Sequence, residues 1–232
     1  MYIDIRTMKN IFKLVLIFCL FINNTYGQRI TINRIESRLI TNEGVEFIGD
    51  LKVKNNDLYS FSNWDNQAVI FLDSNRYTLS NINFNVSTNT FVSRINRDKL
   101  FSFKTNEIDS VLINNLLFKK FGNSFYEVLF EKGDNLLLKK YDITFKKGIE
   151  NRLGVGTIGK TKTIIAYNYL IKSGKLFKRI ELNKSSIISL IENDNNKNEL
   201  ENFVKNENLS YKKVDDIILI FKFILQNYHK IT

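Results

Sequence analysis

The 232-residue chain contains one histidine, one cysteine and no proline, and these shortages exclude most familiar enzyme sites. A Ser-His-Asp or Cys-His arrangement would depend on His229, on a thiol, or on both. Zinc sites built from histidine and cysteine are excluded in the same way, and the sequence has no D-x-[DN]-x-[DN]-G calcium loop. We therefore expect no catalytic residues, no metal site and no cofactor. Only a carboxylate pair of the glycosidase type stays open.

The missing proline carries less information. Asn, Ile, Lys and Phe are abundant, and a strongly AT-rich genome imposes such a bias through its codons. An apolar fraction of 44% and an aromatic fraction of 13% nevertheless indicate a globular chain with a hydrophobic core.

The N-terminal segment has the pattern of a secretory signal peptide. Lys9 and Lys13 precede an uninterrupted apolar run at residues 14–22, LVLIFCLFI. Nine residues rise only about 14 Å as a helix, which is too short to cross a bilayer. Met8 is the expected start of translation.

Small residues at Thr25 and Gly27 predict cleavage before Gln28. Removal of residues 1–27 also removes Cys19, which follows a phenylalanine where a lipoprotein signal requires a small residue. The mature chain is therefore expected to lack thiols and disulfides and to have no transmembrane span.

The chain is basic, with a net charge of +10. Residues 1–27 carry three cations and one anion, a net of +2, so the mature chain keeps +8. A nucleic-acid-binding surface usually clusters its cations on one element, whereas these lysines occur in scattered pairs among acidic residues. We expect a solvated basic surface and no nucleic-acid partner, with attraction to anionic lipid headgroups or surface polymers as the alternative.

Short β-branched and aromatic segments separated by Asn, Asp, Gly and Ser predict an antiparallel β region. In NINFNV the alternation predicts that Ile82, Phe84 and Val86 face a core and that the asparagines face solvent. YDITFKK at residues 141–147 repeats the pattern. Gly133-Asp134 and Ser173-Gly174 predict hairpins, and about ten to twelve strands are expected between residues 30 and 182.

The hydrophobic period changes after Leu182, where three helices are predicted at residues 185–192, 197–206 and 211–228, the last with Ser210 as its N-cap. The apolar stripe of the last helix is broad, which predicts burial between the sheet and the shorter helices. Docking of this helix to a partner or a membrane is the alternative.

GVGTIGKT at residues 154–161 fits the spacing of both a phosphate-binding loop and a dinucleotide fold. Such loops need a buried strand before the glycines and a helix after them. Here a polar segment precedes the motif, and KTIIAYNYLI, which has a strand composition, follows it. We predict a connection between two strands and no nucleotide.

Two pairs of residues are weak candidates for ligand or partner contact. Trp64 and Asp65 lie in FSNWDNQAV, where a tryptophan beside polar side chains could stack on a sugar, although a core position is the simpler interpretation. Phe221 and Phe223 belong to the apolar stripe of the last helix.

From residue 44 to residue 228, the chain resembles a family of uncharacterised exported proteins of Gram-negative bacteria. The resemblance depends on NWDNQAVIFLDSNRYTLSNINFN, SFYEVLFEKGDNLLLKKY and AYNYLI in this order, followed by the helices. It implies a signal peptide and a β domain capped by helices, with no established activity and no catalytic residues.

The sequence therefore predicts an α+β fold, an antiparallel β-sandwich or meander with a C-terminal helical cap. The expected parts are a signal peptide at residues 1–27, a β domain at 28–183 and helices packed on it at 184–232. The expected function is a non-enzymatic interaction with an unknown envelope protein, lipid or surface polymer, in the periplasm, at the outer membrane or outside the cell. The alternatives are a lipid- or glycan-binding β domain and, third, a carboxylate-dependent hydrolase.

Overall fold

The computed structural model describes residues 37–42, 44–55, 58–146, 149–150, 157–158 and 161–228. The predicted signal peptide and His229 lie outside the described residues. Of GVGTIGKT, only Thr157, Ile158 and Thr161 are described. The segment after the motif is a strand, as its composition predicts.

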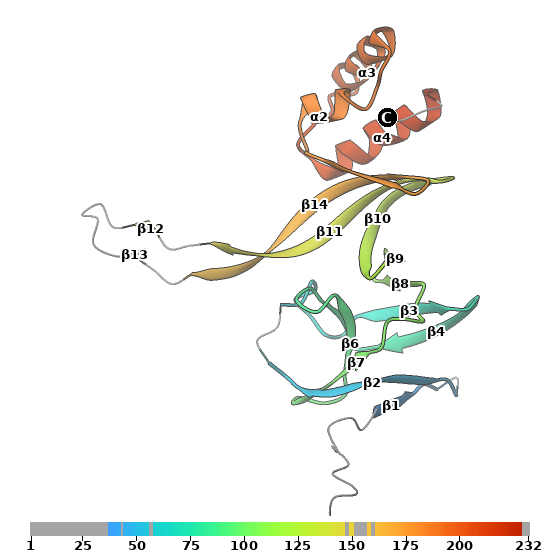
Figure 1. Cartoon of the computed structure of the whole chain (residues 1–232), viewed down its shortest axis with the longest axis vertical. Helices are drawn as coiled ribbons and strands as arrows, with labels where there is room; N and C mark the ends of the chain where they lie inside the picture. The colour runs from blue at the N-terminus through green and yellow to red at the C-terminus, as the bar shows by residue number, and fades with distance from the viewer. Residues whose placement is uncertain are drawn as a thin grey trace, which may run out of the picture. The chain divides into compact units, whose positions relative to one another are not determined.

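The described strands form two large antiparallel sheets and one short ribbon (Figure 1). Sheet A contains, in spatial order, β1 (Ser37–Ile40), β2 (Glu46–Val53), β7 (Lys99–Phe103), β6 (Thr90–Arg94) and β5 (Ile82–Asn85). Sheet B contains, in spatial order, β15 (Leu176–Ile180), β14 (Lys162–Ser173), β11 (Asn135–Lys146), β10 (Ser124–Lys132), β9 (Leu116–Phe121), β8 (Ser110–Ile113), β3 (Gln67–Leu72) and β4 (Asn75–Ser80). The ribbon pairs β12 (Ile149–Glu150) with β13 (Thr157–Ile158). A mostly antiparallel β fold with C-terminal helices is thus confirmed, with fifteen strands among the described residues.

Two-residue turns join neighbouring strands of sheet B. Gly133 and Gly174 occupy the first central position of their hairpins with φ of 57° and 55°, so both predicted hairpins are confirmed. Between β8 and β9, Asn114 and Asn115 both have positive φ, the requirement of a type I′ turn. Asparagine therefore serves as a turn residue in this proline-free chain.

Strand β10 changes its partner along its length. Its first part, up to Glu127, pairs with β9, and its second part, from Glu127 onward, pairs with β11. A bulge between Val128 and Phe130 accompanies the change, because an extra residue bends a strand and interrupts its ladder. Figure 1 shows β10 curving from β11 toward β9. Glu127 is the one residue of β10 that pairs with both neighbours.

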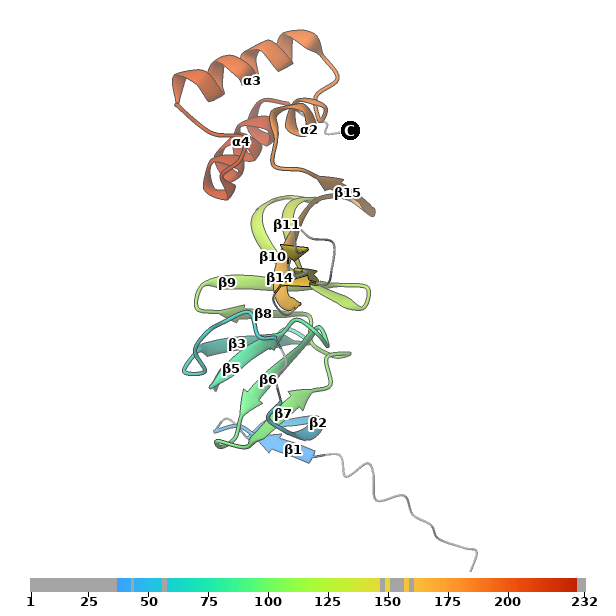
Figure 2. The same cartoon turned by 90° about the vertical axis from the view of Figure 1, so that its left-hand side faces the viewer.

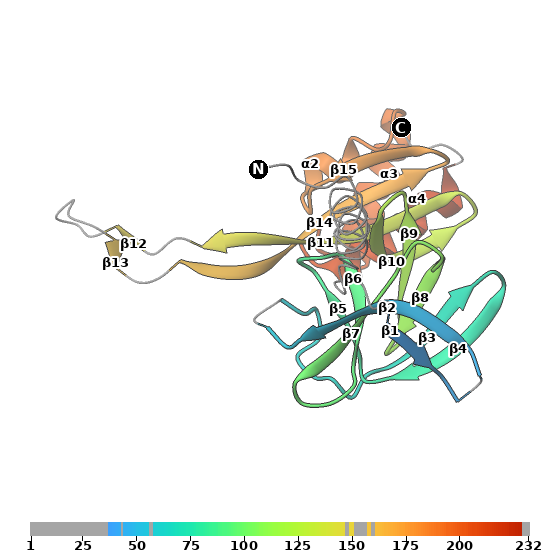
Figure 3. The same cartoon turned by 60° about the horizontal axis from the view of Figure 1, so that its bottom comes forward.

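The buried apolar side chains form two clusters. The first, which we call the sheet core, lies between sheet A and the β3–β8–β9 part of sheet B and is rich in phenylalanine, including Phe84, Phe91 and Phe118. The second, the helix core, joins the β10–β11–β14–β15 part of sheet B to the helices. Figures 2 and 3 show the helices over that part of sheet B.

One prediction about the strand NINFNV is wrong. Asn83 and Asn85 are buried rather than solvent-exposed, and residues 58–60 run along the edge of β5, where Tyr59 forms a bridge with Asn85. The Asn83 side chain accepts a hydrogen bond from Phe61 N (3.1 Å) and donates to Phe61 O (2.8 Å) and Asn63 O (3.1 Å). These bonds offset the cost of burying an amide, so polar alternation did not mark a solvent face here.

Three helices follow the sheets: α2 (Lys184–Ile188), α3 (Asp194–Asn206) and α4 (Val214–Asn227). Asn183 and Asn193 cap the first two with their side chains. The predicted N-cap of α4, Ser210, is wrong: its hydroxyl accepts from Lys212 N (3.2 Å) in the preceding turn, and the helix begins later with Lys213 as N-cap. No helix of the described residues is long and apolar enough to span a membrane.

Candidate interaction site

The four side chains nominated from the sequence lie in two separate places. Trp64 is half-buried, with the Tyr59 ring against it at 4.8 Å and the Arg94 guanidinium over it at 5.7 Å. Asp65 beside it is exposed. The indole therefore already contacts an aromatic ring and a cation of its own chain, as a packing role requires.

The two phenylalanines of α4 differ in exposure. Phe221 is 2% exposed and its ring meets Phe130 of β10 edge-on, so it belongs to the helix core. Phe223 is partly buried, stacks on Phe203 of α3 at 4.1 Å, and lines a hollow of about 170 Å³. Helix α4 thus lies between the sheet and α3, which confirms the burial predicted from its broad stripe.

A different element combines exposed apolar side chains with a base that polar contacts hold in place. Strands β11 and β14 are twelve residues long and pair along their full length, but β10 pairs with β11 only up to Lys139 and β15 pairs with β14 only from Tyr169. We call residues 140–146 and 162–168 the arm. Among the described strands, none pairs with either outer edge of the arm, and Figures 1 and 3 show it extending away from sheet A and from the other strands of sheet B.

We call residues 139–142 and 167–169 the root of the arm. On the face that packs against the two cores, polar contacts hold this root in place. The Glu127 carboxylate is buried, forms an ion pair with Lys139 Nζ at 2.9 Å, and accepts a short hydrogen bond from the Tyr141 hydroxyl. The same Lys139 ammonium lies 4.8 Å from the Tyr141 ring and 4.6 Å from the Tyr167 ring. Burial, and next the hydrogen bond to Glu127 and its charge, raise the pKa of the Tyr141 hydroxyl, so this proton stays in place at neutral pH.

These residues form a joint between the two hydrophobic cores. Tyr141 packs against the sheet core, while Tyr169, opposite Lys139 in the ladder, packs against the helix core. Glu127 therefore ties the root of the arm to the point where β10 changes its partner. Burial and the charge of Glu127 also raise the pKa of Tyr169.

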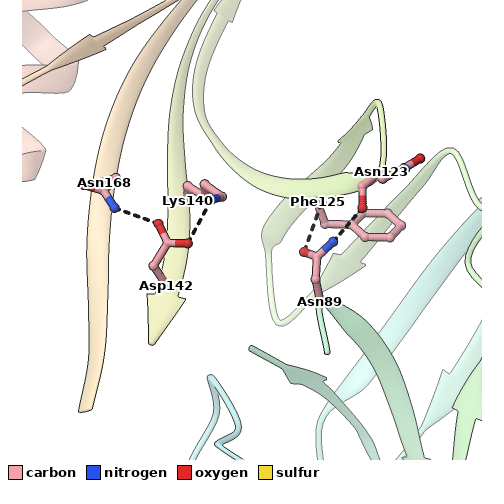
Figure 4. Close-up of polar contacts among 6 residues, drawn as sticks. All are labelled: Asn89, Asn123, Phe125, Lys140, Asp142 and Asn168. Atoms are coloured by element: carbon pink, nitrogen blue, oxygen red, sulfur yellow. Dashed lines mark hydrogen bonds and ion pairs between the residues drawn. The ribbon is translucent and has the colours of Figure 1, made fainter. Parts of the chain in front are cut away.

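The other face of the root has its own cluster, shown in Figure 4. The Asp142 carboxylate accepts from Lys140 Nζ at 2.8 Å and from Asn168 Nδ2 at 2.7 Å. Burial raises the pKa of Asp142, but these hydrogen bonds and the charges of Lys140 and Arg179 outweigh it, so the pKa lies below its ordinary value. The root is therefore clamped on both faces.

Figure 4 also shows how the start of β10 is held to sheet A. Asn89, in the turn between β5 and β6, donates to Asn123 O at 2.9 Å and accepts from Phe125 N at 3.2 Å. Because β10 continues from this anchor to Glu127, the same strand links sheet A to the arm.

The arm exposes apolar side chains on both faces: Phe145 and Tyr167 lie on one face, and Ile164, opposite Thr144, lies on the other. Ile143 and Ile165 still pack against the sheet core, whereas Phe145 is 67% exposed, Tyr167 49% and Ile164 42%. The exposure of Phe145 corrects the expectation that it shares a buried strand face with Tyr141 and Ile143: two strands alone cannot cover both of their faces.

The arm ends in two opposed cations. Lys146 and Lys162 are directly opposite in the ladder and both exposed. Like charges at such a position destabilise a strand pair. No ion pair to either side chain is found in the described part of the chain.

No protein-family model, characterised protein or solved structure matches the chain. Among the described residues, no group of three or more His, Cys, Asp or Glu side chains could hold a metal ion. Sequence reasoning missed Glu127, Lys139 and the arm as a unit, although two long strand-forming segments around a glycine-bearing connection were a readable signal for a projecting hairpin.

Proposed function

We propose that this is an exported, non-enzymatic protein of a Gram-negative bacterium that binds another envelope protein through its arm. The proposal takes residues 1–27 as a signal peptide and the remainder as a β-sandwich or meander, residues 28–183, capped by the helices of residues 184–232. The family resemblance and the N-terminal pattern support export, and the shortage of histidine and cysteine supports a binding role over catalysis.

The observation that carries the binding role is the arm itself. Exposed Phe145, Tyr167 and Ile164 lie on a two-stranded element with free edges, and such elements are marginally stable without further contacts. The ion pair between the buried Glu127 carboxylate and the partly exposed Lys139, together with the Asp142 cluster, holds the root in one orientation. A rigidly mounted apolar projection binds a partner with little loss of conformational entropy.

The binding role can be tested by site-specific photo-crosslinking in the native host. A photoreactive phenylalanine derivative at position 145 should crosslink the full-length protein to a discrete envelope partner. The same derivative at Leu176, which is 78% exposed but lies outside the arm, is the matched control and should give no such product. Equal products at both positions, or none at position 145, would contradict the proposal.

A substitution gives an independent readout of the same role. Phe145→Ser should leave the free energy of unfolding within about 0.5 kcal/mol of the wild type, since the side chain is mostly exposed. It should nevertheless reduce crosslinking from a second arm position, Thr163, which is exposed and lies directly opposite Phe145 on the same face. An unchanged yield would mean that the partner does not contact this face of the arm.

Export is tested separately by fractionation of the host and mass spectrometry of the mature N-terminus. We expect a chain that begins at Gln28 in the periplasmic, outer-membrane or extracellular fraction. A cytoplasmic chain that keeps residues 8–27 would refute this part of the proposal and leave the binding test intact.

A further inference from the structure

The two outer edges of the arm carry backbone hydrogen-bonding groups whose direction can be deduced from the ladder. Gly174 N donates to Asp134 O at 3.3 Å, and these two residues continue the β11–β14 register by one pair beyond Asn135 and Ser173. Hydrogen-bonded and non-hydrogen-bonded pairs alternate in an antiparallel ladder. The even-numbered residues of β11 therefore bond to β14, and the odd-numbered residues direct their N–H and C=O groups toward the other edge.

Within the arm these outward residues of β11 are Tyr141, Ile143 and Phe145. In the preceding part of β11, strand β10 occupies the same edge. At Glu127, β10 separates from β11 and pairs with β9 instead. The free edge runs from Lys140 to Lys146, seven residues and about 23 Å in length. Exposed edges of this kind are templates for the addition of a further strand.

The side chains along this edge specify what an added strand should contain. One face carries Tyr141, Ile143 and Phe145, which suit apolar side chains opposite them. The other face carries Lys140 and Asp142, which form an ion pair with each other, and ends in Lys146 with Lys162 beside it. An acidic side chain opposite Lys146 would offset the like-charge repulsion there, whereas one opposite Asp142 would be repelled. The complementary strand thus has apolar side chains at every second position and an acidic side chain opposite Lys146.

We propose that the β11 edge of the arm, from Lys140 to Lys146, binds an extended acidic segment of the partner protein by β-strand addition. The inference rests on the proposed binding function and names the chemistry of the partner. A second copy of this chain fits poorly, because an antiparallel β11 of that copy centred on Ile143 would place Lys140 opposite Lys146.

The first experiment uses the full chain and, as the probe, a seven-residue peptide with glutamate at both ends, valine at the second, fourth and sixth positions, and threonine at the third and fifth. Residue-resolved amide hydrogen exchange should show that the amides of Tyr141, Ile143 and Phe145 exchange about tenfold more slowly at saturating peptide. The even-numbered amides of β11, already bonded to β14, should change much less. Equal protection of both sets, protection of the β14 edge instead, or no protection would each overturn the proposal.

The second experiment tests the charge. Lys146→Glu should weaken binding of the glutamate peptide about tenfold or more, and the variant should stay folded because Glu at position 146 can pair with Lys162. Lys212→Glu makes the same change of charge at an exposed lysine before α4 and should leave the affinity within about twofold. Equal losses in the two variants would mean that only net charge is sensed, which contradicts a defined site.

The outcomes separate this inference from the binding role on which it rests. Crosslinks at position 145 without alternating amide protection would leave the binding role in place and refute strand addition. Protection of Tyr141, Ile143 and Phe145 that grows with protein concentration in the absence of peptide would identify a second copy as the occupant, and would overturn the acidic partner.

Discussion

We expect Glu127→Ala to lower the free energy of unfolding by about 4 kcal/mol and to weaken the connection between the two cores. The carboxylate is buried and holds both the Lys139 ammonium, at 2.9 Å, and the Tyr141 hydroxyl. Removal of one partner from a buried ion pair costs about 3–5 kcal/mol, and the lower end of this range applies here because the remaining Lys139 side chain is 18% exposed.

Two structural details bear on the size of the effect. The Tyr141 hydroxyl would lose its acceptor, which adds about 1–3 kcal/mol if no water replaces it. The Lys139 ammonium would keep its contacts with the Tyr141 and Tyr167 rings, which stabilise a cation by about 0.5–2 kcal/mol and so limit the loss. For a folded unit of this size, a loss of 4 kcal/mol corresponds to a fall in Tm of roughly 8–16 °C.

Urea unfolding with two probes is the assay. Trp64, the only tryptophan, reports by fluorescence on the segment beside sheet A, and far-ultraviolet circular dichroism reports on the helices. The two transitions should coincide in the wild type and separate in Glu127→Ala, because Glu127 joins the sheet core to the helix core. Coincident transitions in the variant would refute its role as a joint.

A double-mutant cycle isolates the ion pair. Glu127→Leu and Lys139→Met should each cost about 3 kcal/mol or more, whereas the double variant should be more stable than either single variant, because a well-packed apolar pair can replace a buried ion pair. Additive losses, with a coupling energy below about 0.5 kcal/mol, would show that the two charges do not interact significantly.

Three further substitutions test other contacts. Gly49→Ala should cost about 3 kcal/mol or more in thermal unfolding, because its Cβ would lie 2.2 Å from Ser102 O, and a loss below about 1 kcal/mol would contradict this close approach. Burial, and next the charge of Glu199, raise the pKa of Tyr228 from 10.0 to about 12. The contribution of this hydroxyl to stability is therefore present below pH 10 and is lost as the pH rises toward 12. Tyr228→Phe should flatten this part of the alkaline stability profile. Folding lowers the pKa of Asp142, so the contribution of its carboxylate to stability is present above pH 3.8, its ordinary pKa, and is lost as the pH falls below that value. Asp142→Asn should reduce the loss of stability in acid. An unchanged acid profile would contradict the role of Asp142 in holding the root of the arm.

The predictions from local pattern succeeded where local forces decide the structure. The hairpin turns at Gly133 and Gly174 follow from backbone sterics, and the strand after GVGTIGKT follows from its β-branched residues. The broad stripe of α4 correctly placed the helix between the sheet and α3. Export, the signal peptide and the absence of catalysis stay predictions.

The predictions that failed concern burial by distant segments. Asn83 was expected in solvent because polar residues alternate in NINFNV, but residues 58–63 return beside β5 and bond its amide. Phe145 was expected in a core because the alternating pattern places it on the same strand face as Ile143, but no described strand or helix covers that end of β11. Alternation specifies which residues share a face and leaves open what lies against that face.

The sequence by itself determined the strand-forming segments, the turns that join them and the helices that end the chain, because these depend on residues close together along the backbone. Only the tertiary structure decided that β10 changes its partner at Glu127 and that Lys139 and Tyr141 meet this carboxylate. It likewise decided that β11 and β14 extend beyond the ends of β10 and β15 and form the arm. Each of these features depends on pairing between distant segments, and periodicity carries no information about which strand lies beside which.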